Sequence, residues 1–382
     1  MHVLNRKYNE FSTSWRAFLR RWFSKDKTFD GAARDICAAI IGQTWNGRFY
    51  QTGLGHFDFF WARDFGTVAR SLVALGHREG MHATIRWALE HYKEAGYVAL
   101  CLTSEGIGFD EPFPSSDALA WFLHSVRVAE FPLSSEDRTF LQNDVRRFCD
   151  QFLDAETGLV REYEKIAELR DAVHYRRSAY SVTILALLCR ELGLLDIPVP
   201  ELLKRNYVEI LKRDYWNGEY FDADFGVHAW SSEANLFPFW LGFIEDNEMH
   251  GKVIETISRK GLTDPYPIRY TDSPESFSYY AWERYFMPNY QGTTLWTWLG
   301  AIYLQVLYQA NHVEFGSEYE KFIKLIEEHH NFPEMLNTDG SWYKTLFYRA
   351  EEGMLWAAIF LEIPSGTYFL KMRKESLESS IK

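Results

Sequence analysis

The chain has 382 residues, of which 47% are apolar and 25% are charged, and its formal net charge is −12. This composition is typical of a globular protein with a sizeable core, and the length allows either two domains or one large one. The Lys and Arg residues are scattered along an acidic chain, which argues against nucleic acid and anionic membrane surfaces as partners. No run approaches the roughly 20 apolar residues of a membrane span.

The cysteine pattern indicates a reducing compartment. Cys37, Cys101, Cys149 and Cys189 lie far apart, and none forms a CxxC or another metal-binding spacing. We therefore expect buried thiols rather than disulfides. The N-terminus has neither an unbroken apolar region nor a small-residue cleavage site. Together these features predict a cytoplasmic protein.

Helical periodicity dominates the sequence, and strand-like runs are scarce. One set of predicted helices is strongly apolar: Phe65–Leu75, Ala118–Val128, Tyr180–Leu192, Leu236–Ile244, Leu295–Tyr308 and Gly353–Leu361. The segments between them are more charged and amphipathic: Met81–Ala95, Glu136–Leu153, Pro200–Arg213, His250–Arg259 and Ser317–His329.

The alternation of these two sets predicts the architecture. Apolar helices suit an inner layer, and amphipathic helices suit an outer layer that buries one face only. No linker divides the chain, so we predict an all-α fold with a single domain over residues 1–382, an (α/α)6 barrel of two concentric helix layers, ending in a polar tail over 365–382. A solenoid of helix pairs is the competing architecture, but no fixed-period repeat supports it.

The segments before the apolar helices are rich in Trp, Asp, Glu, Asn and Gly. They read GHFDFFWARD, FDEPFPSSD, ELRDAVHYRR, HAWSSEAN, MPNYQGTT and FPEMLNTDG. In such a barrel these loops open at the same end and converge on one polar, aromatic-lined pit, the expected shape of a small-molecule site. Aromatic residues make up 17% of the chain, and flat aromatic faces suit the apolar faces of sugar rings.

Hydrolysis of a glycosidic bond needs two carboxyl groups that flank the bond. The predicted loops carry several carboxylates, and their spacing alone does not choose between them. Glu164 and Glu168 lie on an amphipathic run before Asp171, where a solvated face is the simpler interpretation.

Five segments resemble the (α/α)6 glycoside hydrolases, which include the glucosidase domain of glycogen debranching enzymes, the glucoamylases and the neutral invertases. The segments are FFWARDFGTVARSLVALG from Phe59, SSDALAWFL from Ser115, RDAVHYRRSAYSVTILALL from Arg170, NYQGTTLWTWLGAIYL from Asn289 and FPEMLNTDG from Phe332. They occur in the order of those families and span about residues 55–363. The chain departs from the usual motifs at Arg170, Gln291 and Thr297, where Met, Asn and Pro are usual.

The resemblance implies an inverting glycoside hydrolase in which Asp171 is the general acid and Glu334 the general base. It implies an oligosaccharide or a small glycoside, foremost an α-glucoside, as substrate. The residues expected to bind this substrate are Trp61, Arg63, Asp64, Asp117 and Tyr290 in the −1 subsite, with Glu233, Asn235 and Gln291 nearby.

Each of these positions also has a structural interpretation. Asp171 could cap the helix that begins near Ser178 or pair with a neighbouring arginine, and Glu334 could belong to a capping box. Asp64 is placed to cap the Phe65 helix, and Trp296 and Trp298 suit a helix core.

Two other functions remain open. A sugar epimerase on the same barrel would need paired histidines, for which His174 and His228 are the candidates, and a non-catalytic carbohydrate-binding protein would need neither pair. No loop groups His and carboxylates at metal-ligand spacing, and neither a P-loop nor a GxGxxG segment is present, so we expect no metal and no nucleotide cofactor.

Overall fold

The computed structural model describes residues 15–23 and 27–364. The predicted polar tail lies outside these residues. Within them, no helix combines the length and the apolar character needed to cross a bilayer.

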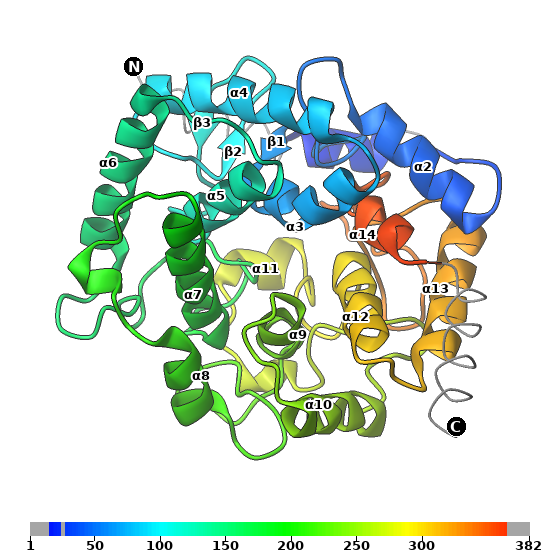
Figure 1. The fold of residues 1–382 in the computed structure, drawn as a ribbon. Helices are drawn as coiled ribbons and strands as arrows, with labels where there is room; N and C mark the ends of the chain where they lie inside the picture. Colours follow the sequence, from blue (N-terminus) through cyan, green and yellow to red (C-terminus); the bar gives the residue numbers. More distant parts are fainter. Residues whose placement is uncertain (1–14, 24–26, 365–382) are drawn as a thin grey trace, which may run out of the picture.

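Six helices form a closed inner ring. They are α3 (Ala62–Ala74), α5 (Ala118–Val128), α7 (Ala179–Leu194), α9 (Ser232–Trp240), α12 (Thr297–Gln309) and α14 (Ala357–Glu362). Each contacts the next in this order, and α14 returns to α3 (Figure 1).

Six further helices lie outside this ring and alternate with it along the chain. They are α2 (Ala33–Thr44), α4 (Arg78–Ala95), α6 (Ser135–Phe152), α8 (Tyr207–Tyr215), α10 (Asn247–Arg259) and α13 (Phe315–His329). Figure 1 shows them around the periphery of the molecule. The predicted all-α barrel of two concentric helix layers is therefore confirmed for the described part of the chain.

The two layers differ in burial as their sequences predict. In α12, every residue from Thr297 to Leu307 is buried, as expected of a helix with neighbours on all sides. In α6, the buried residues recur at helical spacing from Leu141 to Phe152, which leaves the charged face in water. The N-terminus of α6 is closed by a capping box between Ser134 and Asp137.

Some predicted boundaries differ from the structure. The helix α2 was not predicted, and it completes the outer layer by packing on α13 and α14. The predicted Leu236–Ile244 helix ends at Trp240, shortly before Gly242 at φ +73°. In the predicted 200–213 segment, η1 (Glu201–Leu203) forms a single 3-10 turn before α8 begins.

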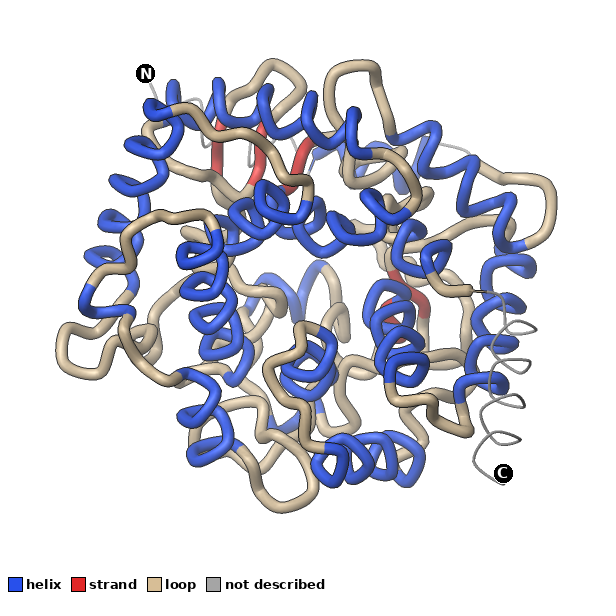
Figure 2. The backbone as a smooth tube through the Cα atoms, viewed as in Figure 1, coloured by secondary structure: helices blue, strands red, loops and turns tan. Residues whose placement is uncertain are grey.

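The strands in the described residues are short and stand beside the starts of inner helices. The antiparallel pairs β1 (Phe60–Trp61) with β2 (Cys101–Leu102) and β2 with β3 (Gly108–Phe109) form one sheet, and β4 (Leu295–Trp296) pairs with β5 (Met335–Leu336). Figure 2 shows the first group between α4 and the inner helix α3, and the second beside α12. Because β1 runs into α3 and β4 into α12, the sheets fix how these two helices begin.

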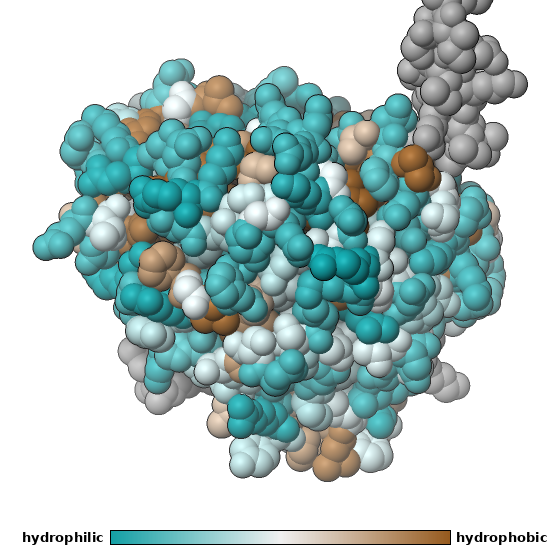
Figure 3. Space-filling view, turned by 90° about the horizontal axis from the view of Figure 1, so that it is seen from below, coloured by the Kyte–Doolittle hydropathy of each residue, from teal (hydrophilic) through white to brown (hydrophobic). Residues whose placement is uncertain are grey.

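The described chain also contains η2 (Pro274–Ser276), α11 (Ala281–Phe286) and a helical segment over residues 15–23. The four cysteines are free thiols, three of them buried and Cys189 half-buried. The face in Figure 3 is mainly hydrophilic, with hydrophobic groups scattered over it in small areas.

Candidate active site

A cavity with about 520 Å³ of empty space, part of it open solvent, lies at the N-terminal ends of four inner helices. All its lining residues lie in or before the first two turns of α3, α7, α12 and α14. They are Thr52, Phe57, Trp61, Arg63, Asp64, Thr67, Leu169, Asp171, Tyr290, Gln291, Trp296, Trp298, Glu334 and Trp356. Loops far apart in sequence therefore meet at one end of the barrel, and the two carboxyl groups singled out from the sequence line the same cavity.

Asp171 has a carboxyl group that is only partly satisfied by the protein. Its Oδ2 lies 3.5 Å from Nη1 of Arg63, and its side chain is 22% exposed. Its Oδ1 has no hydrogen-bond partner among the described residues. Burial raises the pKa of Asp171 to about 7; Arg63 opposes this rise and the nearby Asp117 adds to it. Asp171 can therefore hold a proton near neutral pH.

Asp171 takes neither of the two structural roles considered above, a helix cap or the partner of an arginine close to it in sequence. The helix α7 is capped by Ser178, whose side chain accepts a hydrogen bond from the backbone N–H of Ser181. Arg176 pairs with Glu162 at 2.9 Å rather than with Asp171. The partner of Asp171 is instead an arginine from α3.

Glu334 is 1% exposed and accepts three hydrogen bonds. Oε1 accepts from the Tyr290 hydroxyl at 2.6 Å, and Oε2 accepts from the Tyr348 hydroxyl at 2.7 Å and from the Glu351 backbone N–H at 2.9 Å. Burial raises the pKa of Glu334, while His56 and these hydrogen bonds oppose the rise. The chain after Glu334 continues as strand β5, so the residue does not cap a helix.

Arg63, from the first turn of α3, contacts two acidic groups. Its Nε and Nη2 donate to the two carboxylate oxygens of Asp117 at 2.7 and 3.1 Å, and its Nη1 faces Asp171. The planar guanidinium suits this two-point contact. Asp117 thus orients Arg63 toward the cavity.

Asp64 lines the cavity and caps no helix. The N-cap of α3 is Trp61, and no side-chain cap hydrogen bond forms there. Oδ1 of Asp64 accepts instead from the indole Nε1 of Trp356 at 2.9 Å. Burial raises the pKa of Asp64 to about 7, against the effect of Arg63.

Gln291 lines the cavity, but its amide is engaged by the loop that carries Asp171. Its Oε1 accepts from the backbone N–H of Ala172 at 2.8 Å, and its Nε2 donates to the carbonyl of Leu169 at 3.1 Å. The backbone carbonyl of Gln291 accepts from Nε of Arg170 at 2.8 Å. Two of the three departures from the family motif, Arg170 and Gln291, are therefore in direct contact.

Three residues expected to bind substrate do not line the cavity. Asp117 is fully buried, and its carboxylate oxygens accept from Arg63, Ser115 and Tyr180. Asn235 is fully buried and bonds to the backbone of Phe221 and Ser231.

Glu233 is the third of these residues. It is 2% exposed, and its Oε1 accepts from the Tyr175 hydroxyl at 3.1 Å. The structure thus leaves Asp117 at the N-cap of α5, and Glu233 and Asn235 within α9, outside the cavity lining, and it gives all three side chains contacts within the protein.

The aromatic wall of the cavity is larger than sequence reasoning indicated. Trp296, Trp298 and Trp356 line it together with Trp61. Trp296 and Trp298 fit the predicted core role by burial, but each also has a surface in the cavity. The buried indole nitrogens of Trp61 and Trp298 have no hydrogen-bond partner among the described residues, so each can donate to a bound molecule.

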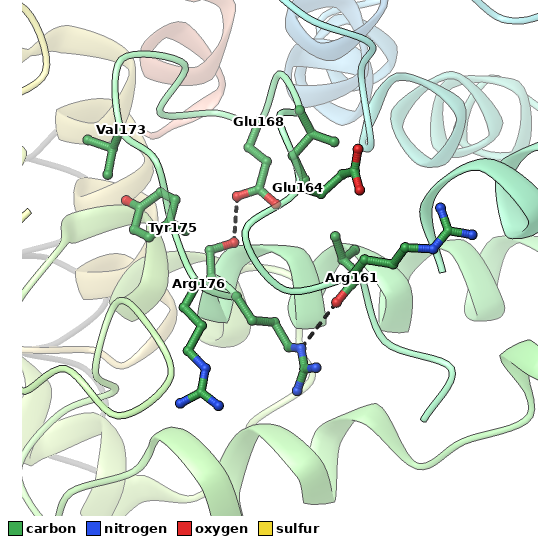
Figure 4. A pocket seen from close by; sticks show the side chains of 10 residues that line it. Arg161, Glu164, Glu168, Val173, Tyr175 and Arg176 are labelled. Atoms are coloured by element: carbon green, nitrogen blue, oxygen red, sulfur yellow. Dashed lines mark hydrogen bonds between the residues drawn. The ribbon is translucent and has the colours of Figure 1, made fainter. Parts of the chain in front are cut away.

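A second, smaller cavity of about 300 Å³ lies beside the loop that carries Asp171 (Figure 4). Its lining includes Glu164 and Glu168, and Glu168 points toward Ser178, whose hydroxyl donates to it at 2.5 Å. Glu168 is 4% exposed, so its assignment to a solvated face was wrong. Burial raises the pKa of Glu168 to about 8. It does not line the larger cavity, where Asp171 lies.

The two histidines considered for epimerase chemistry do not line the larger cavity. His174 Nε2 lies 3.0 Å from the carbonyl of Tyr163, and the side chain of His228 is 82% exposed beside Asp222. Among the described residues, no group of three or more His, Cys, Asp and Glu side chains is arranged to hold a metal ion.

The sequence matches no protein-family model and no curated protein. Solved structures are similar to the fold. The GH63 mannosylglycerate hydrolase from Thermus thermophilus superposes with a TM-score of 0.56 at 12% identity, over 86% of this chain and 99% of the other.

Two larger proteins show the same likeness. A bacterial glucoamylase complexed with acarbose gives a TM-score of 0.57 at 13% identity, over 88% of this chain and 55% of the other. A rhamnosidase from Klebsiella oxytoca with rhamnose bound gives 0.55 at 10% identity, over 89% and 66%. The chain has the (α/α)6-barrel fold of these glycosidases.

Proposed function

We propose that this protein is an inverting glycoside hydrolase in which Asp171 is the general acid and Glu334 the general base. One observation carries the proposal: two carboxyl groups from different loops line one aromatic cavity in opposite chemical settings. Asp171 has a free oxygen and a pKa raised to about 7, whereas Glu334 accepts three hydrogen bonds, as an ionised carboxylate does.

The reaction follows from these two settings. Protonated Asp171 gives its proton to the glycosidic oxygen as the bond from that oxygen to the anomeric carbon breaks. Glu334 takes a proton from a water molecule whose oxygen attacks the anomeric carbon from the opposite face. The products are a free alcohol and a sugar of inverted configuration, with Asp171 ionised and Glu334 protonated. Proton exchange with solvent then restores both groups.

The remaining cavity residues supply contacts for the sugar. Asp64 would accept from ring hydroxyls while Trp356 holds it in place. Arg63 would donate to an oxygen near Asp171, since Asp117 fixes its orientation. The indole rings give flat apolar faces, and the free Nε1 atoms of Trp61 and Trp298 are donors.

The substrate we favour is a small glycoside or the end of an oligosaccharide, foremost an α-glucoside. The cavity is lined by aromatic side chains with polar groups among them, as small-molecule sites are. Solved structures with this fold include a glucoamylase with acarbose and a mannosylglycerate hydrolase in complexes with glucose and with D-glycerate. The free thiols keep the cytoplasm as the expected compartment.

The test is a panel of α- and β-linked disaccharides and small glycosides that includes α-glucosides and mannosylglycerate. Release of a sugar by the wild-type protein supports the proposal, and NMR of the first product before mutarotation reports its anomeric configuration. Inversion is expected. Retention would leave a hydrolase but contradict the roles given to the two carboxyl groups. Binding without hydrolysis across the panel would indicate a carbohydrate-binding protein.

A further inference from the structure

The hydrogen bonds to Glu334 continue into a buried chain of polar residues. The Tyr348 hydroxyl, which donates to Glu334, lies 3.2 Å from Nε2 of His56. Nδ1 of His56 lies 2.9 Å from Oε2 of Glu351. The same oxygen accepts from the backbone N–H groups of His56 and Phe57, so Glu351 also holds the loop before α3. Burial opposes ionisation of Glu351, but His56 and Arg20 hold its pKa well below the usual range.

This chain ends on an arginine from the N-terminal part of the protein. Residues 15–23 are helical, and Arg20 from this segment reaches inward until its side chain is only 9% exposed. Its Nη1 donates to Oε1 of Glu351 at 2.5 Å, and its Nη2 lies 2.8 Å from Oε1 of Glu352. A cation from another element thus balances glutamates beside Glu334.

The space for Arg20 is built into the backbone. A Cβ atom added at Gly55 would lie 1.6 Å from Nη1 of Arg20 and 2.3 Å from Oε1 of Glu351. Any side chain at position 55 would therefore displace the ion pair. This fit indicates a specific position for Arg20, unlike that of a surface arginine.

The helical segment over residues 15–23 also contacts the hairpin that follows Glu334. That hairpin is closed by the bridges Leu336–Trp342 and Lys344–Arg349, and it carries Tyr348. Nε of Arg21 donates to the carbonyl of Thr345 at 2.8 Å, and the rings of Phe18 and Phe347 lie 6.4 Å apart.

We propose that Arg20 is a positioning residue for the general base, and that it fixes Glu334 through Glu351, His56 and Tyr348. This inference rests on the proposed function. Arg20 touches neither the cavity nor the reacting atoms, so its effect passes through the hydrogen bonds that orient the Glu334 carboxylate. The 15–23 segment is thereby part of the active-site architecture, although it lies outside the barrel helices.

The charges around Glu334 determine in which direction the removal of Arg20 shifts the pKa of Glu334. The groups that face it are Tyr290, Tyr343, Tyr348, His56 and the Glu351 backbone, and Asp171 lines the same cavity. Behind them, Arg20 and Arg349 balance Glu351 and Glu352. Removing Arg20 leaves an excess negative charge, which disfavours ionised Glu334.

The experiment compares Arg20→Met and Arg20→Lys with the matched control Arg16→Met. Arg16 lies one turn away in the same segment, where its side chain is 32% exposed and pairs with Asp58. Arg20→Met is expected to lower kcat by up to about 10²-fold, the scale of a displaced reacting group, with little change in KM. The acid limb of the pH–rate profile should move to higher pH. Arg20→Lys should recover part of kcat, and Arg16→Met should match the wild type.

A second measurement does not depend on activity. In protein labelled at the glutamate carboxyl carbon, Glu334→Gln identifies the resonance of Glu334, and its titration is followed by NMR. Arg20→Met should raise the pKa of Glu334, and Arg16→Met should not. One outcome is that the wild type hydrolyses a substrate while Arg20→Met shows the same kcat and the same pKa of Glu334 as the wild type. In that case the inference fails and the proposed function stands. A shifted titration in a protein that hydrolyses nothing would refute the proposed function and, with it, the role of Arg20 in positioning a general base.

Gly55→Ala provides an independent displacement of Arg20 should the methionine variant not fold. It should reproduce the loss of kcat and the shifted titration. If Arg20→Met, Arg20→Lys and Gly55→Ala all fail to fold, Arg20 acts in stability rather than in positioning, and the inference is overturned.

Discussion

The indole Nε1 of Trp356 donates a hydrogen bond of 2.9 Å to Oδ1 of Asp64. Asp64 lies in the first turn of α3 and Trp356 is the N-cap residue of α14, so the bond joins the first and last helices of the inner ring where the ring closes. Both residues line the larger cavity. The contact therefore holds the Asp64 carboxyl group in the cavity wall.

Asp64→Ala is expected to impair substrate binding or turnover well beyond its effect on stability, because Asp64 makes no helix cap. Asp246→Ala is the matched control, since Asp246 caps α10 by accepting from two backbone N–H groups. The control should lose about 0.5–2 kcal/mol of stability and keep its kinetics. Kinetics and thermal unfolding of both variants make the comparison. Unchanged kinetics in Asp64→Ala would assign the residue a structural role.

Gln291→Leu should reduce turnover more than sugar binding. The substitution removes two hydrogen bonds to the backbone on either side of Asp171, and each buried group left unpaired costs about 1–3 kcal/mol. The loop should lose its fixed position, so we expect a fall in kcat of roughly tenfold or more, within the range for misplaced groups. Steady-state kinetics and binding of the product sugar separate the two effects. A rise in KM alone would indicate direct contact with substrate.

Glu168→Gln is expected to flatten the dependence of stability on pH. Burial raises the pKa of Glu168 from 4.5 to about 8, so the folded state holds a proton that the unfolded state releases. The contribution of protonated Glu168 to the free energy of unfolding is fully present below pH 4.5, and it is lost as the pH rises toward 8. Each pKa unit corresponds to about 1.4 kcal/mol as an upper limit.

Thermal unfolding at pH 5 and pH 9 measures this effect. Glutamine stays neutral and can still accept from Ser178, so the variant should gain stability relative to wild type at pH 9. The exposed Glu255 supplies the control variant Glu255→Gln, which should leave the profile unchanged. Identical profiles for Glu168→Gln and wild type would show that folding does not raise the pKa of Glu168.

The fold could be predicted largely from the sequence because helical periodicity reports burial directly. The apolar runs of the inner ring and the charged runs outside it each follow from how many neighbours a helix has. The helix α2, ARDICAAIIGQT, was missed although its buried residues recur at helical spacing. Leu295 and Trp296 suit a helix by composition, but pairing with Met335 and Leu336 makes them a strand. Such long-range pairing leaves no periodic trace.

For the site, the sequence could predict which loops meet but not which side chains reach the cavity. Asp117 and Arg63 both lie in the segments that resemble known glycosidases. In the structure only Arg63 lines the cavity, and the Asp117 carboxylate orients it. The contact of Arg20 with Glu351 joins positions 331 residues apart, and no local pattern marks it. The choice of Asp171 and Glu334 came from resemblance to known families.

The pH–rate profile should be bell-shaped, with turnover lost on the alkaline side near pH 7. Asp171 must be protonated, and burial raises its pKa to about 7, so activity falls as the pH rises through that value. Glu334 must be ionised, so activity also falls at acidic pH, and burial places this limb above the ordinary value of 4.5.

Asp117→Asn tests the origin of the alkaline limb. Asp117 raises the pKa of Asp171 by its charge, and it also occupies the guanidinium of Arg63. The variant should therefore shift the alkaline limb to lower pH, because both effects of the substitution favour ionised Asp171. The measurement is kcat/KM against pH. A limb that stays in place would mean that another group titrates there.

Asp171→Asn and Glu334→Gln should each abolish most turnover while the fold and sugar binding remain. An amide keeps the shape of the carboxyl group but can neither donate the acid's proton nor accept one from water. Such steps are typically worth about 10²–10⁴-fold each. Glu168→Gln is the control, because Glu168 is a buried carboxyl group on the loop of Asp171 that lies outside the larger cavity.

The carboxyl groups of Asp171 and Glu334 should stand about 6.5–9.5 Å apart in a crystal structure with bound sugar, the separation that leaves room for a water. Turnover near that of wild type in both amide variants would refute the catalytic assignment, whereas loss of turnover in Glu168→Gln alone would move the acid to the smaller cavity.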